Sequence, residues 1–111
     1  MIKVIIAGGR DFNDHELMDR EYTREEMQIV SGMAQGADSA GVQLAEDYNL
    51  EVVKYPALWH VHGKSAGYKR NVQMAENATH LLAFWDGKSK GTEHMINIAN
   101  KLELKVIVVN Y

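Results

Sequence analysis

Three glycine-rich segments of this chain have the composition of loops that bind phosphate. They are residues 8–11 (GGRD), 31–38 (SGMAQGAD) and 86–92 (DGKSKGT), and the second and third lead into segments with helical periodicity. Glycine lets a phosphate approach main-chain N–H groups, and the start of a helix adds unpaired N–H donors and the positive end of its dipole. Each loop taken alone is equally well explained as a tight turn.

Several larger side chains are candidates for contacting such a ligand. The best cations for a phosphate are Arg10, Lys69 and Arg70, although a solvated helix start or an ion pair explains them as well. Phe12 directly follows the first glycine loop and is a candidate wall for stacking a base. Trp59 and Trp85 are further aromatic candidates, but large aromatic residues in small domains more often belong to the core.

Familiar nucleotide and metal motifs are absent from the chain. Two Gly-Lys-Ser tripeptides look like the end of a P-loop, but Leu58 and Leu82 occupy the positions where that motif needs its first glycine. No GxGxxG pattern follows the first apolar run. His60 and His62 lack a convincing third ligand, and the chain has no cysteine. We therefore predict neither a metal ion nor a bound cofactor.

Short apolar runs alternate with helical patterns along the chain. The runs are nearly continuous, as in parallel strands buried on both faces, and lie at 2–7, 28–31, 51–55, 80–85 and 105–110. Between them apolar residues recur at helical spacing, and the faces expected to point inward comprise Ala37, Ala40, Leu44, Ala45 and Tyr48, then Tyr68, Val72, Met74 and Ala75, then Met95, Ile98, Ala99 and Leu102. The polar stretch 14–26 predicts one short helix and an irregular connection. Asn49 is expected to cap the C-terminal end of the helix that contains Leu44 and Ala45.

Such alternation predicts an α/β fold with a five-stranded parallel sheet, right-handed crossovers and helices on both faces. In such sheets ligands lie outside the carboxyl ends of the strands. The three glycine-rich loops follow three of the predicted strands at this edge. Their shared position favours ligand binding over three unrelated turns.

Composition narrows the class of protein. With 111 residues, we expect one domain spanning 1–111. The net charge of −3 provides no broad attraction for nucleic acid. No apolar run approaches the roughly 18 residues of a membrane span, and the short apolar start is better interpreted as a strand than as a signal peptide. We therefore predict a cytoplasmic protein without nucleic-acid or membrane partners.

Four motifs in order resemble the small YspA-like branch of the SLOG superfamily, which joins the Smf/DprA proteins to the LOG phosphoribohydrolases. They are GGRDF at 8–12, VSGxAxGAD at 30–38, GKxAGxxRN at 63–71 and WDGxSxGT at 85–92. Only the stretch 13–27 is shorter than the family pattern. The resemblance implies a Rossmann-like three-layer domain with strand order 3-2-1-4-5, which brings the first and last of these motifs together. It also implies sensing or processing of nucleotide-derived signals, in small proteins that look like those of bacteria and phages.

One position departs from the enzymes of the superfamily. The LOG signature continues GGxGTxxE, and Met95 stands where its glutamate would be. Glu93 lies about 200° away around a helix. Methionine neither accepts a proton nor stabilises a developing positive charge, so hydrolysis by the LOG machinery is not expected.

The leading hypothesis is a module that binds a nucleotide or nucleotide-derived signalling molecule, such as an ADP-ribose relative or a cyclic nucleotide, to sense or sequester it. The residues expected at its site are Gly8, Gly9, Arg10, Asp11, Phe12, Ser31, Gly32, Gln35, Gly36, Ala37, Asp38, Ser65, Arg70, Asn71, Trp85, Asp86, Gly87, Gly91 and Thr92.

Two alternatives stay open. One is a hydrolase of such a ligand, by N-glycosidic or phosphoester cleavage, with Asp11 or Asp86 as acid or base. The other is a DprA-like contact with single-stranded DNA, which the negative net charge opposes. We also expect a homodimer or higher homo-oligomer, with an apolar patch drawn from Met33, Trp59, Met74 and Met95.

Overall fold

The computed structural model describes residues 2–9, 27–32 and 37–111, without the side chains of residues 27, 37–40, 59 and 64. Its centre is one sheet of five parallel strands in the order β3-β2-β1-β4-β5. The strands are β1 (Ile2–Gly8), β2 (Met27–Ser31), β3 (Glu51–Lys54), β4 (His80–Trp85) and β5 (Lys105–Asn110). The predicted α/β, Rossmann-like fold and its strand order are confirmed.

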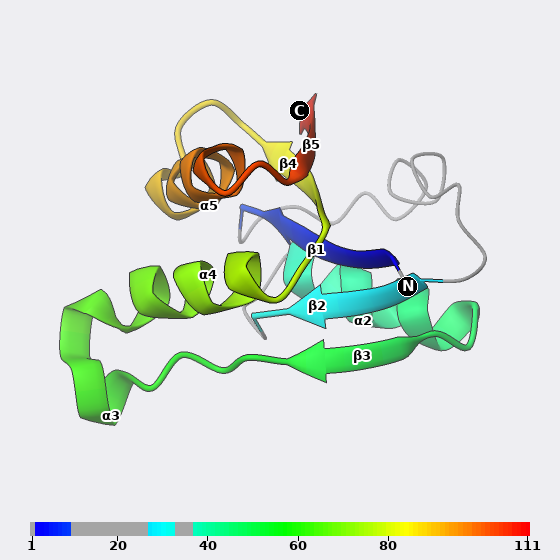
Figure 1. Ribbon diagram of the computed structural model, residues 1–111, viewed down its shortest axis with the longest axis horizontal. Helices are drawn as coiled ribbons and strands as arrows, with labels where there is room; N and C mark the ends of the chain where they lie inside the picture. Colours follow the sequence, from blue (N-terminus) through cyan, green and yellow to red (C-terminus); the bar gives the residue numbers. More distant parts are fainter. Residues whose placement is uncertain (1, 10–26, 33–36) are drawn as a thin grey trace.

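Helices cover both faces of this sheet (Figure 1). They are α2 (Ala37–Asp47), the short α3 (Trp59–His62) with the 3₁₀ turn η1 (Gly63–Ser65), α4 (Ala66–Glu76) and α5 (Lys90–Lys101). Helix α2 packs on one face, and α4 and α5 pack on the other. The helix predicted in 14–26 lies outside the described residues.

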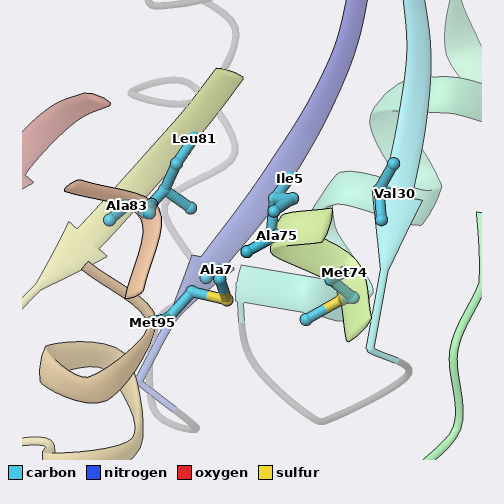
Figure 2. Packing of buried hydrophobic residues seen from close by; sticks show 9 residues of the cluster. Ile5, Ala7, Val30, Met74, Ala75, Leu81, Ala83 and Met95 are labelled. Carbon is cyan, nitrogen blue, oxygen red and sulfur yellow. The ribbon is translucent and has the colours of Figure 1, made fainter. Parts of the chain in front are cut away.

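The alternation of side chains along β1 explains why both faces are buried. Val4 and Ile6 contribute to the core beneath α2, and Ile5 and Ala7 contribute to the core beneath α4 and α5. Figure 2 shows the second of these cores, with residues of the two helices resting on β1, β2 and β4. Because consecutive residues of a strand point to opposite faces, one continuous apolar run supplies both cores.

Three residues predicted to point inward are exposed instead. Tyr48, Tyr68 and Leu102 have exposed fractions of 48%, 45% and 43%. Tyr48 and Leu102 directly follow α2 and α5, so they lie at the helix ends, beyond the buried positions Ala45 and Ala99. Tyr68 lies in the first turn of α4, an end of the helix that extends past the strand ends (Figure 1).

Two helices are followed by a residue other than glycine in the left-handed region. Asn49 follows α2 with φ 57°, which confirms the predicted cap, and Glu103 follows α5 with φ 62°. After α5, the N–H of Leu104 donates to the carbonyl of Ala99 at 2.9 Å, the long bond of a Schellman motif. Asparagine tolerates this conformation because its short polar side chain can hydrogen-bond to the nearby backbone, whereas the longer glutamate side chain gains no such bond.

Replacing Glu103 with glycine is therefore expected to stabilise the fold by about 0.5–1 kcal/mol, because glycine adopts positive φ without a Cβ clash. Asn49→Gly is the matched control at the equivalent position after α2, and its gain should be less than half as large. Urea unfolding followed by circular dichroism measures both. A loss of stability in Glu103→Gly would contradict the assigned helix end.

Within the described ranges, no helix is both long enough and apolar enough to cross a membrane.

Candidate functional site

The strand order reverses between β1 and β4, at the centre of the sheet. β2 and β3 lie on one side of β1, and β4 and β5 lie on the other. Gly8, the last residue of β1, pairs with Phe84 near the end of β4. The loops that leave these two strands therefore start side by side, as expected from the resemblance. In open parallel sheets this is the place where ligands bind.

The turn from β4 into α5 is built around Asp86. Its Oδ1 accepts hydrogen bonds from the N–H groups of Ser89 at 2.9 Å and Lys88 at 2.8 Å. These bonds, first the one from Ser89, hold the pKa of Asp86 below its ordinary value. Gly87 lies inside the turn with φ 83°, a conformation that favours glycine. A carboxylate with a lowered pKa is ionised at neutral pH, so Asp86 is poorly suited to be a general acid.

Ser89 joins this turn to the start of α5. It is the N-cap residue, and its Oγ accepts from the N–H of Thr92 at 3.4 Å and lies 3.1 Å from Thr92 Oγ1. The indole Nε1 of Trp85 donates to the Ser89 carbonyl at 3.1 Å. Trp85 is only half-buried and Thr92 is buried. In the described structure both residues shape the turn.

Gly91 lies in the first turn of α5 and is exposed. A Cβ placed on it would meet none of the described atoms within 4 Å. The first N–H groups of a helix have no partner within the helix, so the backbone around Gly91 offers donors beside open space. A helix start of this kind is compatible with a bound anion, and binding at this loop stays a prediction.

Gly32 has a structural role that the sequence did not indicate. The Nη1 of Arg70 donates to the Gly32 carbonyl at 2.8 Å. A Cβ on Gly32 would come within 2.8–2.9 Å of the Arg70 side chain. The glycine is thus required for the close approach of the guanidinium, which ties α4 to the end of β2. Ser31, directly before it, is buried.

Asn71 connects Arg70 to the start of α5. Its Oδ1 accepts from Arg70 Nε at 3.3 Å, and its Nδ2 lies 3.3 Å from the Gly91 carbonyl and 3.2 Å from His94 Nδ1. The ring of Tyr68 meets the His94 ring edge-on, with centroids 4.6 Å apart. Asn71 is 5% exposed, and burial lowers the pKa of the partly buried His94.

Sequence reasoning did not single out His94 as a site residue. The available signal was its spacing, because His94 follows Gly91 by three residues and so lies on the same face of α5. Most of the predicted residues lie at the carboxyl edge of the sheet, on the middle of α4 or at the start of α5: Gly8, Gly32, Arg70, Asn71, Trp85, Asp86, Gly87, Gly91 and Thr92. Buried Gly9 directly follows β1 at the same edge.

The other predicted residues lie away from this edge or outside the described residues. Ser65 is exposed, and its Oγ donates to the His62 carbonyl at 3.0 Å, within the turn before α4. Ala37 and Asp38 begin α2, but their side chains are not described. Outside the described residues lie Arg10, Asp11, Phe12, Gln35 and Gly36. Among the described residues, no three histidine, aspartate or glutamate side chains form a group that could hold a metal ion.

The predicted apolar patch for self-association is wrong in two of its members. Met74 and Met95 are 2% and 1% exposed and belong to the core beneath α4 and α5. Figure 2 shows Met95 beside Ala7 of β1. These side chains therefore stabilise the chain's own fold. The side chains of Met33 and Trp59 are not described, and the oligomeric state stays a prediction.

The chain is similar to one described protein family and to a phage protein. The family model described as "YspA, cpYpsA-related SLOG family" matches residues 2–62. The Gene 61 protein of Mycobacterium phage D29 is 34% identical over 119 residues, covering 96% of this chain and 95% of the phage protein. No solved structure matches the chain significantly.

Proposed function

The chain belongs to the YspA, cpYpsA-related SLOG family, and we propose that it binds a phosphate-bearing nucleotide derivative at the carboxyl edge of β1 and β4. Family membership suggests a nucleotide-related function. The observation that supports this site best is the open space over Gly91, in the helix that starts where the strand order reverses. A phosphate there would accept hydrogen bonds from the first turn of α5, and Gly8 and Gly9 would border it from β1.

Two exposed lysines beside this turn are suited to an anionic ligand. Lys88 and Lys90 flank the N-cap of α5, and both are exposed. Their ammonium groups add to the positive end of the helix dipole. The carboxylates of Asp86 and Glu93 lie in the same two turns and offset this charge. The two lysines would therefore act on a phosphate by direct contact rather than through a positive field at long range.

We expect the double variant Lys88→Gln/Lys90→Gln to bind ADP-ribose roughly tenfold more weakly at low salt, with a smaller dependence of affinity on ionic strength. Isothermal titration calorimetry at two salt concentrations measures both effects. Lys101→Gln/Lys105→Gln, at the last residue of α5 and the first residue of β5, is the matched control with the same change in charge. Equal losses in both double variants would indicate general charge attraction and count against this site.

Native mass spectrometry of the purified protein, followed by chromatography of any released molecule, tests the function itself. An intact nucleotide or nucleotide derivative would support the binding module and identify its ligand. Free base or inorganic phosphate after incubation with ADP-ribose or AMP would show turnover and favour the hydrolase instead. Salt-sensitive binding of single-stranded DNA, without binding of small nucleotides, would overturn the proposal.

A further inference from the structure

We infer that Asn71 holds His94 as the neutral imidazole with its proton on Nε2, so that His94 acts as an uncharged hydrogen-bond donor beside Gly91. The tautomer follows from contacts between described side chains and needs no ligand. The use of this donor by a ligand rests on the proposed function. The acceptor would be an uncharged oxygen or nitrogen atom in the nucleoside part of that ligand.

The orientation of the Asn71 amide is set on two sides. Arg70 can only donate, so the atom facing its Nε must be the amide oxygen. The Gly91 carbonyl can only accept, so the atom facing it must be the amide nitrogen. The opposite orientation would place two donors together on one side and two acceptors on the other. Asn71 therefore has one favourable orientation.

This orientation determines the protonation of His94. The Asn71 Nδ2 carries two hydrogens, of which one serves the Gly91 carbonyl and the other faces His94 Nδ1 at 3.2 Å. His94 Nδ1 must then accept, and in the neutral ring the proton resides on Nε2. A doubly protonated ring would direct an N–H toward the amide donor. The burial that lowers the pKa of His94 acts in the same direction.

Further contacts fix the ring next to the candidate phosphate site. Tyr68 packs edge-on against it with an interplanar angle of 64°. Arg70, which orients Asn71, is itself anchored to the end of β2 through the Gly32 carbonyl. His94 and Gly91 share one face of α5. An uncharged donor at this place suits a ribose oxygen or a base acceptor adjoining a phosphate, because neither carries the charge that would favour an imidazolium.

Nitrogen-detected NMR of the uniformly ¹⁵N-labelled protein without ligand tests the tautomer. We expect His94 to show an unprotonated Nδ1 and a protonated Nε2 at neutral pH. In Asn71→Asp an acceptor oxygen would face His94 Nδ1, so the ring should move its proton to Nδ1 or become doubly protonated. A proton on Nδ1 in the unmodified protein would overturn the inference even if Asn71→Asp fails to fold.

Calorimetry with ADP-ribose tests the ligand contact. His94→Gln keeps one acceptor and one neutral donor and should bind within about threefold of the unmodified protein, whereas His94→Phe keeps the ring and should bind at least tenfold more weakly. Equal binding by all three proteins would overturn the contact. A loss in His94→Phe for ribose 5-phosphate as well as for ADP-ribose would assign the acceptor to ribose, and a loss for ADP-ribose alone would assign it to the base.

Failure of the proposed function has a separate signature. If the Nε2–H tautomer is observed but neither ADP-ribose, AMP nor ribose 5-phosphate binds the unmodified protein, the nucleotide site and its ligand contact are overturned together. The positioning of His94 by Asn71 would then still stand as a property of the fold.

Discussion

Gly91→Val is expected to leave the fold about as stable as the unmodified protein while weakening ADP-ribose binding on the order of 100-fold. The fold should tolerate the side chain because a Cβ at this position meets none of the described atoms within 4 Å. The helix propensities of glycine and valine differ by only a few tenths of a kcal/mol. A phosphate bound to the first turn of α5 would occupy the space into which the valine projects. Calorimetry gives the affinity, and urea unfolding gives the stability.

Gly41→Ala is the matched control, because Gly41 also lies within a helix of the chain. There a Cβ would lie 3.1 Å from Cβ of the buried Ile6, an atom attached directly to the β1 backbone. We expect the opposite pattern, a loss of about 1–2 kcal/mol of stability with unchanged affinity of the folded protein. Undiminished binding by Gly91→Val would show that no ligand approaches this turn.

Met95→Glu is expected to destabilise the protein by about 3–5 kcal/mol, a large part of the 5–15 kcal/mol that holds a typical domain together. Met95 is 1% exposed and packs among apolar residues of the sheet, α4 and α5. A carboxylate there has no water, so its pKa would be raised above the ordinary value of a glutamate. The folded variant then binds more protons than the unfolded chain, and its stability should fall as the pH rises above about 4.3.

Thermal unfolding between pH 4 and pH 8 measures this effect. Met95→Leu, which nearly conserves volume, is the control and should cost less than about 1.5 kcal/mol at every pH. This experiment bears on chemistry as well, because Met95 occupies the position of the LOG glutamate. A Met95→Glu variant that stayed stable and released base from AMP would show that the position faces a ligand and would contradict its assignment to the core.

Most of the fold could be predicted because its signals are local. The strands of the sheet are short runs of apolar residues, and the alternation of strands with helices requires parallel pairing and crossover connections. The strand order came from the family resemblance instead, since apolar periodicity does not say which strands are neighbours. Periodicity also failed at helix ends. Tyr48 and Leu102 continue the spacing by one residue past α2 and α5 but are exposed, because spacing alone does not say how far along a helix the sheet covers it.

The site was predictable in its backbone parts. Glycines at the ends of β1 and at the start of α5 are visible in the sequence, and the rule that ligands bind at the carboxyl edge of such sheets places them together. The roles of the side chains were less visible. That Gly32 lines a ligand stays a prediction, and nothing in the sequence indicated that its missing side chain makes room for Arg70.

Local composition and spacing were enough to predict the helices and strands, the parallel sheet and the edge at which the glycine-rich loops gather. The contacts of Arg70 with Gly32, 38 residues away, and of Asn71 with His94, 23 residues away, became visible only in the folded chain. Such contacts depend on how α4 and α5 pack side by side on the sheet. The physical reason is that a hydrogen bond requires two groups within about 3.5 Å, and a distance of this kind between remote residues is set by packing.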